Sequence, residues 1–193
     1  FGTGILDFDN DGWLDLYAAN GRIFKNNPKR YSADPFAEPN ILFRGLAGPR
    51  FEEVLPRGGT SPLLAATSRG AVFGDVDNDG GVDLLVVNRD APAYLLLNRV
   101  SSGGNWLMFR VLNRQGSPAE GARVTMRVGR QTKMREVRTA YSYLVANDPR
   151  VHLGLGKVSK VTDVKVRWAD ATAEGFGEFA ANRIVDLLQG SGE

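Results

Sequence analysis

An aspartate-rich pattern of nine residues occurs twice in the chain and constrains its fold more than any other feature. The pattern D-x-D-x-D-G-x-x-D spans residues 7–15 and recurs 68 residues later, at 75–83. Eight of the fourteen aspartates of the chain lie in these two segments. Each copy is followed by an apolar stretch that ends in asparagine, at Asn20 and at Asn88. A duplicated motif with matching flanks predicts two copies of one supersecondary unit.

The spacing of the aspartates predicts a loop that binds a divalent cation. Alternate carboxylates at loop positions 1, 3 and 5 converge on one side of a tight turn, and the glycine at position 6 lets the backbone bend sharply. A backbone carbonyl at position 7 and an aspartate at position 9 complete the ligand set. Four carboxylates this close repel one another unless a cation neutralises them. The predicted ligands are Asp7, Asp9, Asp11, Trp13 and Asp15 in the first loop and Asp75, Asp77, Asp79, Gly81 and Asp83 in the second.

Hard oxygen ligands in a flexible loop favour calcium, with one structural ion in each of the two loops. Magnesium suits such a loop less well, because it requires octahedral geometry and retains its water. The sequence excludes an EF-hand, since position 12 is Ala18 or Val86 rather than glutamate and lies in an apolar run typical of a strand. A pair of solvated Asp/Asn/Gly turns is the alternative interpretation. Two copies with the same ligand spacing favour the cation loop.

Charge divides the chain into an acidic part and a basic part. Residues 1–100 carry ten Lys/Arg and thirteen Asp/Glu, whereas residues 101–193 carry fourteen and nine. The sign changes at residues 101–104 (SSGG), a composition typical of a linker. We therefore predict two domains, 1–100 and 101–193, with the boundary within Val100–Asn105.

The basic part shows the alternation of half-buried strands. Apolar residues alternate with other side chains at 107–112, 123–128 and 164–168, which is typical of antiparallel sheets. Residues 129–132 (GRQT) predict a hairpin turn. About ninety residues with this pattern predict a small β-sandwich or a barrel-like domain, so the whole chain is expected to be all-β.

The two loops, together with Phe1-Gly2 and Gly70–Gly74, resemble FG-GAP (VCBS-type) repeats, the calcium-loop blades of integrin-α-like β-propellers. The resemblance implies that each repeat forms a four-stranded blade, with calcium in the hairpin between its first two strands. Propellers usually have at least about four blades. Two repeats in a chain that does not begin with Met therefore imply the end of a longer propeller, or an open pair of blades.

Parts of the basic half resemble the ASPIC/UnbV domain. The segments that carry this resemblance are Asn105–Leu107, Glu120–Val124, Val151–Gly156 and Val164–Trp168. The domain commonly follows FG-GAP repeats, as in extracellular cartilage acidic proteins and in bacterial relatives that include enediyne-cluster members. The W-P-D-G turn of the family reads WADA here, at 168–171. The resemblance implies an architecture and no catalytic residues.

Two further features leave alternatives open. The single histidine, His152, is either an acid–base group or a hydrogen-bonded structural residue, and the structural interpretation is favoured. A cluster of basic residues is opposed only by Glu136 and contains Arg123, Arg127, Arg130, Lys133, Arg135 and Arg138. This cluster either binds an anionic glycan, phosphate or nucleic acid, or docks the acidic half of the chain.

The sequence contains no cysteine and no apolar run near the roughly 18 residues that span a bilayer. We expect a non-enzymatic, calcium-binding module for binding, adhesion or assembly that is secreted, periplasmic or at the cell surface. Its partner is expected to be a protein or a glycan within a larger chain or assembly, without nucleic acid and without membrane insertion. The alternatives are an accessory or enzymatic component of a biosynthetic pathway, as for UnbV-like relatives, and a structural subunit of an extracellular assembly.

Overall fold

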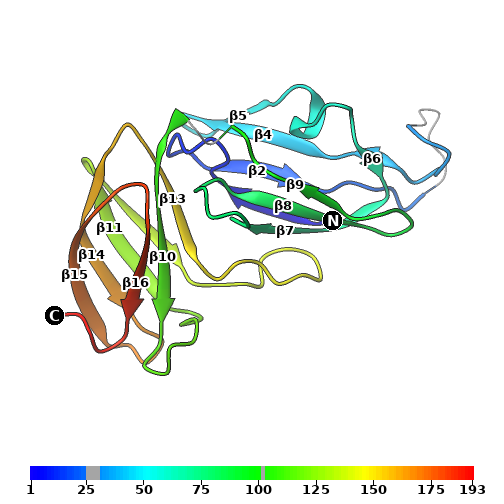
Figure 1. Cartoon of the computed structure of the whole chain (residues 1–193). Coiled ribbons are helices and arrows are strands. Elements are labelled where there is room, and N and C mark those ends of the chain that lie inside the picture. The colour runs from blue at the N-terminus through cyan, green and yellow to red at the C-terminus, as the bar shows by residue number, and fades with distance from the viewer. Residues whose placement is uncertain (25–30, 101–102) are drawn as a thin grey trace.

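A computed structural model describes residues 1–24, 31–100 and 103–193, which form β-strands and one short 3-10 helix (Figure 1). The strands build two units, one from the aspartate repeats and one from the basic part. The prediction of an all-β chain is confirmed. No helix in the described ranges is long and apolar enough to cross a membrane.

The first unit contains β1 (Thr3–Leu6), β2 (Asp15–Ala18), β3 (Glu38–Pro39), β4 (Ile41–Leu46), β5 (Arg50–Glu53), the 3-10 helix η1 (Arg57–Gly59), β6 (Ala65–Ala66), β7 (Ser68–Gly74), β8 (Asp83–Asn88) and β9 (Tyr94–Leu96). The second unit contains β10 (Asn105–Leu112), β11 (Arg123–Val128), β12 (Gln131–Glu136), β13 (Val151–Gly156), β14 (Lys160–Arg167), β15 (Ala173–Ala180) and β16 (Ile184–Leu188).

The first unit consists of two blades that share one apolar core. One blade is the antiparallel sheet β1-β2-β4-β5 and the other is the sheet β7-β8-β9, while β3 and β6 form a short ladder beside them. Side chains on alternate positions of the strands point to the same face of a sheet, and those on the facing sides of the blades form the core. Tyr17, Leu42, Phe73 and Val86 belong to it. In each blade an aspartate loop joins the first two strands, as the resemblance implied. The second blade has three strands within the described residues rather than the four that the resemblance implied.

The second unit is a sandwich of the sheets β13-β10-β16 and β12-β11-β14-β15. β10 and β16 run parallel, whereas the other neighbouring strands pair antiparallel. The two sheets share a core that includes Phe109, Met126 and Leu153. The two sheets do not join into a closed barrel within the described residues. Of the two forms predicted, sandwich or barrel, the structure has the sandwich.

Strand β10 is buried on its sandwich face and, around Met108, on its other face as well, whereas Arg110 on that other face is exposed. Leu107, Phe109 and Val111 point into the sandwich core. Met108, on the other face, is also buried, and it lines a cavity shared with Phe73 of the second blade. The second unit therefore packs directly on the blades.

A long connection between β12 and β13 follows β7 of the second blade. The Phe73 N–H donates to Asn147 Oδ1 at 3.0 Å, and the Phe73 carbonyl accepts from the Asp148 N–H at 3.0 Å. The Tyr141 ring stacks on the Phe73 ring, with 6.2 Å between centroids. These contacts cover a strand edge whose main-chain groups would otherwise be exposed.

The division into domains 1–100 and 101–193 stays a prediction. Residues 101–102, at the predicted boundary, lie outside the described residues. On either side of them, β9 ends at Leu96 and β10 begins at Asn105.

Candidate metal centres

The two aspartate loops have the same backbone conformation at two positions. Position 4 is left-handed in both, with φ of 59° at Asn10 and 60° at Asn78. Position 6 has φ of 93° at Gly12 and 89° at Gly80. Asparagine and glycine are the residues that adopt positive φ most readily. The sequence therefore places each residue type where the turn requires it.

Hydrogen bonds within each loop hold the carboxylate at position 1. In the first loop, Asp7 Oδ2 accepts from the Gly12 N–H at 3.0 Å. In the second, Asp75 Oδ2 accepts from the Gly80 N–H at 2.9 Å. The turn thus points the first carboxylate back into its own loop.

The aspartate at position 9 joins the loop to the rest of its blade. Asp15 accepts from the Phe8 N–H and from the Gly45 N–H of β4, each at 2.7 Å. The equivalent residue of the second loop is Asp83, which accepts at 2.8 Å from the N–H groups of Val76 and Asn98. A sequence pattern does not reveal this link to a later segment of the blade.

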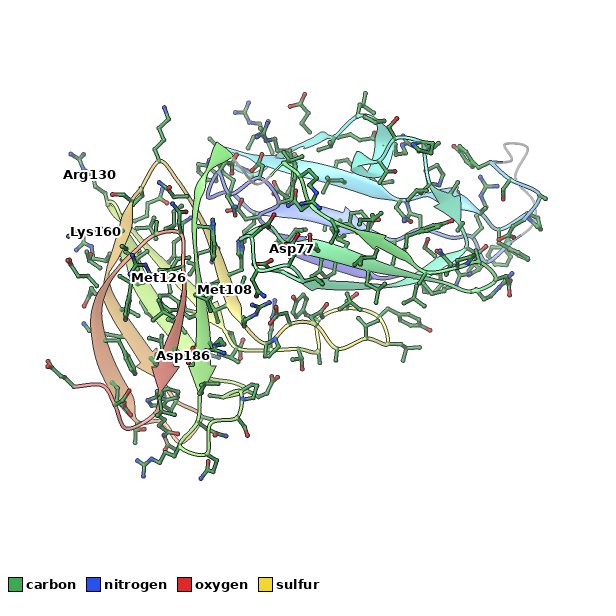
Figure 2. The ribbon with its side chains drawn as sticks, viewed as in Figure 1. Asp77, Met108, Met126, Arg130, Lys160 and Asp186 are labelled. Atoms are coloured by element: carbon green, nitrogen blue, oxygen red, sulfur yellow. The ribbon has the colours of Figure 1, made fainter. Side chains whose placement is uncertain are left out.

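Three carboxylates of each loop come together. One oxygen from each of Asp7, Asp9 and Asp15 lies within 4.8 Å of the others, and all three side chains are buried. The second cluster of the same kind consists of Asp75, Asp77 and Asp83. Figure 2 shows Asp77 at the end of the blades nearest to the second unit, across from Met108.

The aspartates at position 5 lie outside these clusters of three. The Oδ1 atoms of Asp11 and Asp79 accept from the N–H groups of Trp13 and Gly81, each at 2.8 Å. The structure thus gathers three of the four predicted carboxylates in each loop. The assignment of Asp11, Asp79 and the carbonyls of Trp13 and Gly81 as ligands stays a prediction.

An arginine lies beside each cluster. Arg44 forms an ion pair with Asp9. Arg99 Nη1 lies 3.6 Å from Asp77 Oδ2. Both guanidinium groups are at least partly exposed, so each neutralises its loop only from the solvent side.

The electrostatics of the first loop fit a bound cation. Burial, followed by the charges of Asp15 and Asp11, raises the pKa of Asp7 to about 7. Burial also raises the pKa of Asp15 to about 6 and shifts the pKa of Asp75 upward. The buried Asp7 Oδ1 has no hydrogen-bond donor among the described residues. A hard cation would satisfy this oxygen and keep the carboxylates ionised, and the all-oxygen donor set suits calcium.

The second unit contacts main-chain carbonyls of both loops. Lys133 Nζ donates to the Gly12 carbonyl at 2.7 Å, and the Gly156 N–H donates to the Asn10 carbonyl at 2.8 Å. His152 Nε2 lies 3.0 Å from the Gly80 carbonyl. His152 is therefore hydrogen-bonded, as the favoured interpretation of the sequence held.

The basic cluster predicted from the sequence divides between two surfaces. Lys133 reaches the first loop, and Arg135 lines the cavity between the two units. Arg123 and Arg127 are exposed on β11. Docking to the acidic half, one of the two alternatives that the sequence left open, thus involves part of the cluster.

A cavity of about 130 Å³ lies between the loops and the second unit. Asp7, Asp75, Tyr141 and His152 are among the residues that line it. Burial lowers the pKa of His152 to about 4, so the ring is neutral at neutral pH. Because a carbonyl can only accept, Nε2 carries the hydrogen that Gly80 receives.

Comparisons with known proteins agree with this arrangement. Residues 7–86 match the family described as FG-GAP-like repeat, and residues 112–193 match the family ASPIC and UnbV. The two halves of the chain thus match these two families in the order that the sequence predicted, which confirms both resemblances.

The chain is similar to cartilage acidic protein 1. It is 31% identical to the human protein and 30% identical to the mouse protein, over 188 residues that cover 94% of this chain. The match to the protein of Xenopus tropicalis is 26% identical. The chain spans 27% of the length of the human relative and 28% of the mouse relative.

Proposed function

We propose that the chain is a non-enzymatic module in which one calcium ion in each aspartate loop fixes the blades for binding, adhesion or assembly. The observation that carries this proposal is the convergence of Asp7, Asp9 and Asp15, all buried, with no hydrogen-bond donor to Asp7 Oδ1 among the described residues. Burying such a group without a counter-charge is costly. The repetition of the cluster in the second loop supports the same function there.

Calcium would act by tying each loop to its blade. The ligands would be the aspartates at positions 1, 3, 5 and 9 of each loop, with the position-7 carbonyls of Trp13 and Gly81. Asp15 already bonds to Gly45 of β4, and Asp83 bonds to Asn98. A cation on these two aspartates would therefore connect the first hairpin of each blade to a later part of the same blade.

We further propose that the module works outside the cytoplasm, as a secreted, periplasmic or cell-surface protein. Extracellular calcium modules bind their ion with dissociation constants of ~0.1–1 mM, which suits loops whose aspartates at positions 3 and 5 are partly exposed in the second copy. The name of the relatives, cartilage acidic protein 1, supports the same proposal.

A non-enzymatic role is supported by how the polar groups between the two units are used. His152 bonds to the Gly80 carbonyl. Arg150 pairs with Asp148 and donates to the Asp75 carbonyl of the second loop at 2.6 Å. These groups hold the two units together, which leaves them engaged in structure rather than directed at a substrate.

Isothermal titration with calcium tests the proposal, using Asp77→Ala as the diagnostic variant. Asp77 belongs to the second cluster and accepts no hydrogen bond within the described residues. Its replacement therefore removes a proposed ligand without breaking a hydrogen bond that holds the loop. We expect two sites in the wild type and at least a tenfold weaker second site in the variant. Asp90→Ala, which removes an exposed aspartate paired with Arg89, is the matched control and should keep both sites. A wild type that binds no calcium at millimolar concentration would contradict the proposal.

A further inference from the structure

An arginine of the second unit donates hydrogen bonds to the second loop. Arg150 Nη1 donates to Asn78 Oδ1 and Arg150 Nη2 donates to the Asp75 carbonyl, both at 2.6 Å. Asp148 pairs with the same guanidinium, with Nε to Oδ2 at 2.8 Å and both side chains 18% exposed. Because Asp148 neutralises Arg150, these donations add little net positive charge next to a cation site.

Gly80, at position 6 of the same loop, is enclosed by two more side chains of the second unit. The neutral His152 ring donates to its carbonyl. The indole of Trp106 covers its α-carbon so closely that a Cβ there would lie 2.0 Å from the ring. Asn10 Nδ2 of the first loop also donates to the Gly80 carbonyl, at 3.1 Å. The turn of the second loop is thus held at a fixed place.

The first loop is held differently. The carbonyl of Gly12, its position 6, accepts from the ammonium group of Lys133. Within the described residues Lys133 forms no ion pair with a carboxylate, so its charge is not neutralised as that of Arg150 is. A cation beside the first loop opposes a second cation, whereas neutral or neutralised groups hold the second loop.

We infer that Arg150, His152 and Trp106 are positioning residues for the second aspartate loop, so that calcium binding there is coupled to docking of the second unit. This inference rests on the calcium binding proposed above. Mutation of groups that orient metal ligands without binding the metal commonly lowers metal affinity by about 10–100-fold, because these groups fix the ligands before the ion binds. Coupling is reciprocal, so calcium in the second loop strengthens the contact between the blades and the sandwich.

Calcium titration of full-chain variants tests the inference. The double variant Arg150→Met/Asp148→Asn removes the donors without leaving a buried charge unpaired. It should lower the calcium affinity of the second loop about tenfold and leave that of the first loop unchanged. The first loop is therefore an internal control for general loss of stability. The matched control is Arg110→Met/Asp186→Asn, which removes another bidentate pair, with Nη2 to Oδ2 at 2.7 Å, on the exposed face of β10 and β16. It should leave both affinities unchanged.

His152 provides an independent test by rescue. His152→Leu removes the hydrogen-bond donor to the Gly80 carbonyl and should lower the calcium affinity of the second loop. His152→Gln retains an N–H donor and should restore most of that affinity. Wild-type titration that shows no calcium binding would refute the proposed function. Wild-type binding at two sites, with wild-type affinity of the second loop in both the leucine variant and the double variant, would overturn only the inference.

Discussion

At the scale of single residues, the raised pKa values of two aspartates in the first loop predict that calcium binding is coupled to proton release. The pKa of Asp7 is raised to about 7 and that of Asp15 to about 6, chiefly by burial. An unfolded aspartate loses its proton near pH 4. Between about pH 4 and pH 7, these two aspartates therefore hold more protons in the folded chain without calcium than in the unfolded chain, and their contribution to stability falls as the pH rises through that window.

The proposed calcium would reverse this dependence, because a cation binds the ionised carboxylates. We expect the calcium affinity of the first loop to increase with pH from about 5 to about 8, where Asp7 and Asp15 become ionised without help from the ion. Binding at pH 6 should release protons, which titration in two buffers of different ionisation enthalpy measures. An affinity that does not change with pH, together with no proton release, would contradict the assignment of these two aspartates as ligands.

At the scale of elements, a glycine on β13 lets the second unit approach the first loop. A Cβ at Gly154 would lie 2.0 Å from Asp7 Oδ2 and 2.7 Å from the α-carbon of Asn10. Such distances are far inside van der Waals contact, so the strand and the loop would have to separate. The closeness of β13 thus depends on the absence of a side chain at this position.

We expect Gly154→Ala to lower the free energy of unfolding by about 1–3 kcal/mol, the usual cost of overpacking. Gly103→Ala is the control, because no heavy atom lies within 4 Å of a Cβ built there. Denaturant melts of both variants in calcium measure the difference. Equal midpoints for Gly154→Ala and the wild type would show that β13 does not pack on the loop.

The loops could be predicted from the sequence because their chemistry is local. The carboxylates that converge in each loop lie within nine residues, and the asparagine and glycine that bend the loop lie between them. The contacts from the second unit could not be predicted, since Lys133 lies 121 residues from Gly12 and Arg150 lies 72 residues from Asn78. The sequence analysis also missed the connection that follows β7. Individual hydrogen bonds, such as that between Phe73 and Asn147, hold this connection in place, and they require no periodic pattern in the sequence.

At the scale of the whole molecule, both blades carry exposed apolar side chains on the faces that point away from their shared core. Ile5 and Phe51 are exposed on the first blade, and Leu85 and Leu95 on the second. Exposed apolar faces mark interaction surfaces. Such faces would suit the longer propeller that the repeats predict, and the choice between it and an open pair of blades stays a prediction.

The measurement that tests the central claim most directly is a thermal melt in calcium and in chelator. With about 2 mM calcium and a dissociation constant of ~0.1 mM, each loop should add roughly 1.8 kcal/mol to the stability of the folded chain. Chelation should therefore lower the melting temperature of the wild type by several degrees. Asp77→Ala should lose part of that difference and Asp90→Ala none of it. Equal melting temperatures of the wild type in the two buffers would contradict a structural role for calcium.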